Sequence, residues 1–158
     1  MTTPFVTDLS NNTRTAIAQL LNARLADALD LKLAVKQAHW NIRGPAFIAL
    51  HELFDEIAAR FDEHSDTMAE RVVQIGGLAA GTSQAVAKAT SLPAYPLEAT
   101  AQSDHLTALR DRLAAFAKSC RLAIDEADTA GDADTADIMT GISRAVDKDL
   151  WFVAAHLA

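Results

Sequence analysis

The stretch LHELFDEIAARFDEHSDTMAER (residues 50–71) decides the fold. Its apolar residues recur every three or four positions, which is the spacing of one buried helix face. Upstream, Pro45 suits the first turn of a helix. Downstream, the pair Gly76-Gly77 can end one. The sequence therefore predicts a single long helix from about residue 45 to 74. Its apolar stripe comprises Phe47, Leu50, Leu53, Phe54, Ile57 and Phe61.

Three more helical segments flank this one. The periodicity predicts helices at about 12–40, at about 103–127, and from the GDAD stretch at 131–134 through Trp151 to the end, with Asp132 or Asp134 as N-cap. NIRGP separates the first two helices, and Gly44 there can take a left-handed conformation. Residues 76–100 form a long connection with room for a short helical turn near 83–88. Two hairpins joined by one crossover give an all-α, ferritin-like four-helix bundle.

Composition fits one soluble domain spanning residues 1–158. The chain is 50% hydrophobic and has only six glycines and four prolines. Residues 1–11 are expected to be a short flexible or irregular segment without signal-peptide character, and no apolar run could span a membrane. Cys120 is the only cysteine, which favours a reducing, cytoplasmic setting and a packing role for that residue. The formal charge of −7 favours cations over nucleic acid as partners.

The quoted helix carries two pairs of metal-type ligands at i, i+4 spacing: His51 with Asp55, and Asp66 with Glu70. Fifteen residues separate the pairs, about 22 Å at ~1.5 Å per residue, so one metal cannot bind both. Fifteen steps of about 100° leave both pairs on nearly the same side. An antiparallel second copy, related by a two-fold axis near residues 60 and 61, would bring each pair opposite the other.

His39 adds a fifth ligand. It precedes the turn centred on Pro45 by as many residues as His51 follows it, so the two histidines are expected at similar height on neighbouring helices. Two histidines and three carboxylates suit Fe(II), Mn or Zn and are poor for Cu(I).

Other interpretations of these residues remain open on spacing alone. Acidic residues on an exposed helix usually form a solvated face, and Asp62, Glu63 and His64 are assigned to one. HELFD resembles the zinc-protease motif HExxH but has Asp55 in place of the second histidine. No glutamate has a histidine three residues later, which excludes the Glu-x-x-His motif of di-iron sites inside one subunit.

Three segments resemble the Dps family of mini-ferritins: KQAHWNIRGPAFIALHELFDE (36–56), HSDTMAERVVQIGG (64–77) and DTADIMTGISRAVDKDLWF (134–152). The resemblance runs from about residue 15 to the C-terminus. It implies a hollow homo-dodecamer that oxidises Fe(II), preferably with hydrogen peroxide rather than oxygen, and stores ferric mineral against oxidative stress. It also implies ferroxidase sites between subunits, with His39, His51 and Asp55 from one and Asp66 and Glu70 from the other.

The resemblance extends to residues around these sites. Lys36 is expected to pair with a site carboxylate. Trp40 either intercepts stray oxidising equivalents or packs in the core. Acids near the start of the fourth helix would line iron-entry pores, unless they only cap that helix, as Asp132 could. The match is clearest at Asp128 and Asp137. A position between them that is often acidic in relatives is Ala133 here, and the acids lie on either side of it, at Asp132 and Asp134. The acids of this stretch are Asp125, Glu126, Asp128, Asp132, Asp134 and Asp137.

DNA binding is expected to be weak or absent. The first fourteen residues contain one base, Arg14, and the C-terminus has no basic extension. Twelve copies at −7 each would carry −84, which repels a polyanion. Two alternatives to the ferroxidase remain: a DNA-binding, chromatin-compacting protein with nucleoid association, and a cage that binds zinc or manganese without turnover.

Overall fold

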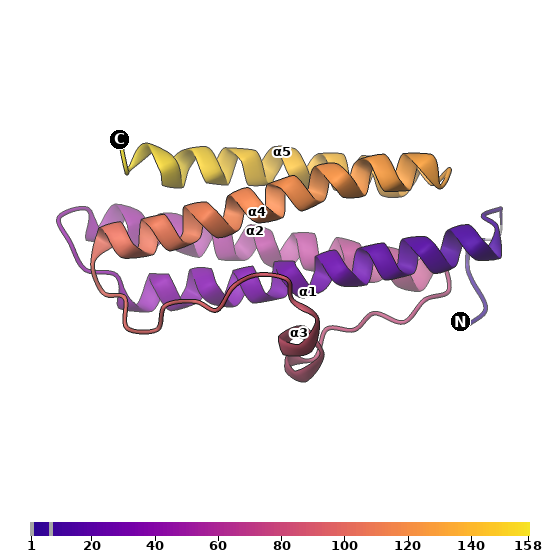
Figure 1. The fold of residues 1–158 in the computed structure, drawn as a ribbon, viewed down its shortest axis with the longest axis horizontal. Coiled ribbons are helices and arrows are strands. Elements are labelled where there is room, and N and C mark those ends of the chain that lie inside the picture. The colour runs from indigo at the N-terminus through magenta and orange to yellow at the C-terminus, as the bar shows by residue number, and fades with distance from the viewer. Residues whose placement is uncertain (1, 7) are drawn as a thin grey trace.

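The computed structural model of the protein describes residues 2–6 and 8–158. Five helices follow one another in this part of the chain: α1 (Asn11–Asn41), α2 (Phe47–Gln74), α3 (Ser83–Ala89), α4 (Gln102–Thr129) and α5 (Ala133–Ala155). The four long helices lie along one another, and the short α3 lies in the connection that runs back along the bundle (Figure 1). This is the all-α ferritin-like bundle that the sequence predicted.

The four long helices form two hairpins, and each hairpin consists of two long helices that follow one another along the chain. α1 packs on α2, and α4 packs on α5. The turn between α1 and α2 includes Gly44, whose φ of 154° is positive but far from the left-handed helical value of about 57°. A Cβ on Gly44 would lie 2.9 Å from Gln102 Oε1, so this close approach requires glycine. α2 begins two residues later than predicted, at Phe47.

The core fills the space between the two hairpins. Its largest fully buried side chains include Phe54, Phe61 and Phe116, and full burial of such a side chain stabilises a fold by about 1.5–3 kcal/mol. Phe47 was predicted to belong to this stripe, but it is 44% exposed because it lies at the first position of α2, outside the packed hairpin. Cys120 is buried in the core, and burial raises the pKa of its thiol to about 12.

Contacts with α1, α4 and the α1–α2 turn hold the second half of the crossover between α2 and α4. Buried Asp27 on α1 accepts hydrogen bonds from the Ser91 amide and hydroxyl. Arg112 on α4 donates to the carbonyls of Pro93 and Ala94. Residues 43 and 101 form an isolated β-bridge, so the crossover is also attached to the α1–α2 turn. These contacts fix a connection that has little regular structure of its own.

The course of the chain places the termini of the long helices at two ends of the bundle. The C-terminal end of α2 and the α4–α5 turn lie at one end, and the α1–α2 turn lies at the other (Figure 1). Among residues 2–6 and 8–158, no helix is both long and apolar enough to cross a bilayer.

Candidate metal centre

His39 and His51 face each other across the α1–α2 hairpin. Their rings stack with centroids 3.7 Å apart and planes 20° apart. Nδ1 of His39 lies 2.7 Å from the backbone oxygen of His51, and Nδ1 of His51 lies 2.8 Å from the backbone oxygen of His39. Because a carbonyl oxygen only accepts, each Nδ1–H must donate. In the neutral imidazole each Nε2 then carries the lone pair that a metal ion requires, and the two hydrogen bonds hold both rings in fixed orientations.

Asp55 lies one turn beyond His51 and forms an ion pair with Lys36. Lys36 Nζ is 2.6 Å from Asp55 Oδ1, which is the pairing expected from the sequence. This hydrogen bond and the charge of Lys36 lower the pKa of the Asp55 carboxyl, and both histidines add a smaller effect in the same direction. Asp55 is exposed, and its Oδ2 remains available to a ligand.

Trp40 is 65% exposed, so it does not pack in the core, and the alternative that assigned it there is wrong. Lys36 Nζ lies 5.7 Å from the centre of its ring, within the range of a cation–π contact. Lys36 therefore contacts both a candidate ligand and the exposed indole. Any role of Trp40 in intercepting oxidising equivalents stays a prediction.

Asp66 and Glu70 lie on the other half of α2, and both are exposed. α2 is continuous from Phe47 to Gln74, so the separation of about 22 Å from the His51 pair holds. In the part of the chain that the structure describes, neither carboxylate forms a hydrogen bond or an ion pair. Residues 2–6 and 8–158 contain no group of three or more His, Cys, Asp or Glu that could hold a metal. One subunit thus presents two incomplete ligand sets.

In the middle of α2, one residue departs from the prediction made from the sequence. Phe61 points into the core, and Arg60 donates to buried Asp149 on α5, with Nη2 2.7 Å from Oδ1. His64 was assigned to a solvated face, but it is half-buried against the edge of Phe61, with ring centroids 5.8 Å apart. Burial lowers the pKa of His64. Asp62 and Glu63 are exposed as expected.

The acids around the α4–α5 turn have different environments. Asp128, Asp134 and Asp137 are exposed, so they remain available to a pore, although pore lining stays a prediction. Asp132 is only 2% exposed because it caps α5, accepting from the Thr135 amide, and pairs with Arg71 at 2.6 Å. Of the two caps that the sequence left open, Asp132 is therefore the one used.

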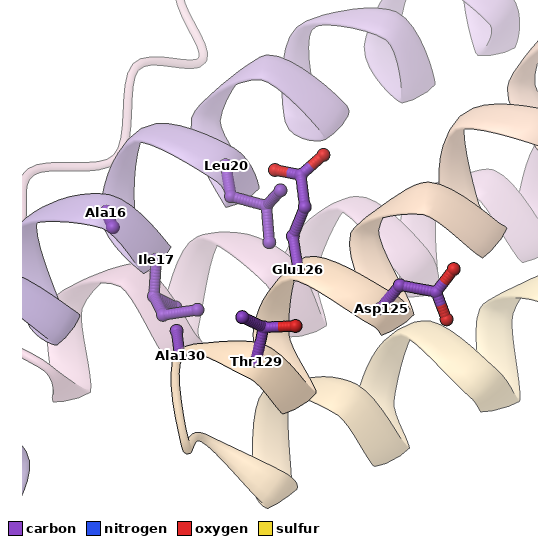
Figure 2. Close-up of a pocket in the computed structure, with 7 residues that line it drawn as sticks. All are labelled: Ala16, Ile17, Leu20, Asp125, Glu126, Thr129 and Ala130. Atoms are coloured by element: carbon purple, nitrogen blue, oxygen red, sulfur yellow. The ribbon is translucent and has the colours of Figure 1, made fainter.

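Asp125 and Glu126, the remaining acids of that stretch, line a hollow of about 340 Å³ between α1 and α4. Ile17 and Leu20 of α1 lie opposite them, and the two carboxylates point in different directions (Figure 2). These acids are therefore not gathered at one point for a cation.

Two polar pairs were not identified from the sequence. Arg71 with Asp132 connects α2 to the start of α5, and only the cap position of Asp132 hinted at its burial. Tyr95 in the crossover lies with its hydroxyl 2.7 Å from Nδ1 of fully buried His105. No sequence spacing links residues 95 and 105, because their contact depends on how the crossover folds back.

Comparison with known proteins agrees with this architecture. Residues 18–158 match the model of the ferritin-like domain family. A DNA protection during starvation protein from Agrobacterium fabrum is 51% identical over 150 residues, covering 95% of this chain and 93% of its own.

Solved structures give the same result. DpsC from Streptomyces coelicolor superposes with a TM-score of 0.95 at 33% identity, over 100% of this chain and 92% of its own. Dps from Microbacterium arborescens, solved in a high iron form, superposes with a TM-score of 0.87 at 36% identity, over 94% of this chain and 96% of its own. The chain therefore belongs to the Dps family of ferritin-like proteins.

Proposed function

We propose that the protein oxidises Fe(II) at sites shared by two subunits and stores the ferric product inside a homo-dodecameric cage. The observation that carries this proposal is the division of ligands along one unbroken helix. Two histidines with free Nε2 atoms and Asp55 lie at one end of α2, and two unpaired carboxylates lie at the other. An antiparallel second copy completes two identical sites at once.

The ligand set suits the chemistry of iron. Imidazole nitrogen and carboxylate oxygen together bind Fe(II) well, and the carboxylates offset the positive charge gained on oxidation. Two Fe(II) ions supply the two electrons that hydrogen peroxide accepts, giving two Fe(III) and two water molecules after uptake of two protons. Peroxide is the preferred oxidant in this proposal because the paired transfer releases no hydroxyl radical.

Groups around the site have supporting roles. Lys36 orients Asp55 and favours its ionised form, because the hydrogen bond and the charge of Lys36 lower the pKa of Asp55. Trp40, exposed beside His39, would accept stray oxidising equivalents before they reach other parts of the cage. Asp128, Asp134 and Asp137 are exposed at the α4–α5 turn and would draw cations inward through pores. The high iron form of the Microbacterium arborescens relative supports iron as the cargo.

DNA protection is the second candidate function, because the name of the 51% identical relative refers to it. The charge of −7 per chain argues against direct binding to the duplex. Protection would then come from removing iron and peroxide rather than from contact. A mobility-shift assay in ~150 mM salt should show no tight duplex complex, and a tight complex would contradict this.

The test of the iron proposal uses the variant Asp66→Ala/Glu70→Ala. Both side chains are exposed and unpaired within the described chain, so the fold and the native mass should be unchanged. Rapid Fe(II) oxidation by hydrogen peroxide should be lost. The matched control replaces two other exposed acids of α2, Glu52→Ala/Glu63→Ala, and should oxidise iron normally. Unchanged kinetics in the first variant would refute the site, and tight zinc or manganese binding without peroxide consumption would favour the non-turnover cage.

A further inference from the structure

A hollow of about 420 Å³ lies beside Glu70 at the end of α2. Its walls include two apolar side chains that are largely open to solvent: Phe5, which is 81% exposed, and Val73, which is 43% exposed. Ala69 and Gln74 complete the lining. An apolar hollow next to a candidate metal ligand is suited to an apolar occupant, because filling it would remove the exposed parts of Phe5 and Val73 from water.

The N-terminal segment forms one wall because the end of α2 holds it. The amides of Phe5 and Val6 donate to the Gln74 carbonyl at 2.9 and 3.1 Å, and the Thr2 amide donates to the Gly76 carbonyl at 3.0 Å. Gly76 has a φ of 83°, and a Cβ there would lie 2.9 Å from the Thr2 oxygen. The backbone of Phe5 is therefore held at the end of α2, with its side chain lining the hollow, although Phe5 belongs to no helix.

The counterpart of this hollow is at the opposite end of the same helix. Ile48 is 61% exposed and lies 25 residues before Val73, so at about 100° per residue the two side chains differ by only about 20° around α2. They share the helix face that carries the metal ligands. The midpoint between residues 48 and 73 is also the midpoint between 51 and 70 and between 55 and 66.

We propose that Ile48 of the partner subunit enters the hollow between Phe5 and Val73. The common midpoint means that the two-fold pairing that completes the ligand set also brings these apolar residues opposite each other. The inference rests on the proposed function for the position of the axis. It assigns Phe5 as a positioning residue: its ring and the inserted isoleucine cover one side of Glu70 and exclude water from it.

Covering Glu70 has a direct electrostatic consequence. Attraction between a carboxylate and a cation strengthens as water is excluded from around them. Groups that surround metal ligands typically change metal affinity by 10- to 100-fold. Removing the Phe5 ring should therefore weaken Fe(II) binding without altering the ligands themselves.

Cross-linking tests the contact directly. In the variant Ile48→Cys/Val73→Cys, the two positions lie about 37 Å apart on one helix, so no link can form within a chain. A short bis-maleimide should convert the assembled protein to covalent dimers on a denaturing gel, with no larger species, because the pair closes on itself. Ile48→Cys and Val73→Cys alone are the controls and should stay monomeric. Cys120 gives no background because it is buried with a raised pKa.

The Phe5 series gives a second measurement that does not depend on cysteines. Phe5→Ala should raise the Fe(II) concentration for half-maximal oxidation by peroxide about tenfold, with the maximal rate and native mass little changed. Phe5→Leu should restore most of the loss, because it refills the hollow. Exposed Leu78→Ala is the matched control and should behave as the unmodified protein.

The outcomes separate the two proposals. If Ile48→Cys/Val73→Cys has the native mass and still oxidises iron but gives no covalent dimer, the contact is overturned and the shared site is retained. A Phe5→Ala variant with unchanged iron dependence would overturn the role of Phe5. Efficient cross-linking together with normal oxidation by Asp66→Ala/Glu70→Ala would instead refute the iron site and retain the contact.

Discussion

Two inactive variants of this protein should restore iron oxidation when they assemble together. In His51→Ala every site lacks an imidazole, and in Asp66→Ala/Glu70→Ala every site lacks two carboxylates, so each variant alone should be inactive. In a mixed pair, one site loses all three groups and the other keeps its full set. The structure supports this arrangement because the two ligand sets lie about 22 Å apart on the continuous helix α2.

The size of the rescue follows from random pairing. In an equal mixture half of the pairs are mixed, and each mixed pair has one intact site of two, so about a quarter of the sites should work. At other ratios the activity should follow the product of the two fractions. Variants co-expressed at known ratios, with initial rates of Fe(III) formation after addition of peroxide, provide the assay.

Two control measurements show whether a loss of activity comes from misfolding or failed assembly. Native mass must show that each variant and each mixture forms the same assembly, and helix content must match that of the unmodified protein. A mixture no more active than its parents would refute the sharing of ligands between subunits. Substantial activity in either parent alone would refute the assignment of the residues replaced in it.

Three further predictions concern single residues. Lys36→Gln removes the hydrogen bond and charge that lower the pKa of Asp55, so the acid limb of the pH profile for Fe(II) oxidation should move to higher pH; an unmoved limb would contradict this. Asp132→Ala should lower the free energy of unfolding by about 3–5 kcal/mol in urea titrations, because it removes the buried carboxylate that caps α5 and pairs with buried Arg71. Within the described residues, Arg71 then keeps only the Thr135 hydroxyl and a 3.8 Å contact with exposed Asp134. The side chain of Asp134 is 82% exposed, so Asp134→Ala should change the free energy of unfolding by less than about 0.5 kcal/mol. Cys120, whose pKa is raised to about 12, should react with a thiol reagent at pH 8 only after unfolding, and prompt native labelling would exclude its burial.

Much of the fold could be predicted because its information is local. Each hairpin pairs neighbouring helices, and Gly44, Gly76 and the cap at Asp132 mark helix ends in the sequence itself. Phe47 shows the limit of periodicity: it continues the apolar stripe in sequence, yet the helix starts there and the packed surface does not extend over it. Periodicity cannot tell a helix end from a helix interior.

The candidate metal ligands were predicted on a different basis. Spacing along a rigid helix converts directly into distance and direction, so the two half-sites could be separated by arithmetic. The mutual hydrogen bonds of His39 and His51 with each other's carbonyls depend on the packing distance of two helices, which spacing does not give. The burial of His64 and His105 likewise depends on tertiary contacts, with Phe61 and with the crossover.

The continuity of α2 has a consequence for when the protein can act. If the proposed half-sites lie on this one continuous helix, a newly synthesised chain should have no oxidation capacity, and the capacity should appear only on association. At high dilution the activity should then fall with the square of the chain concentration rather than in proportion to it. Growth through the α2 contact alone is also limited, because symmetric pairing uses every half-site and leaves none to recruit a third chain at this contact. An offset pairing would leave free half-sites and continue into a filament.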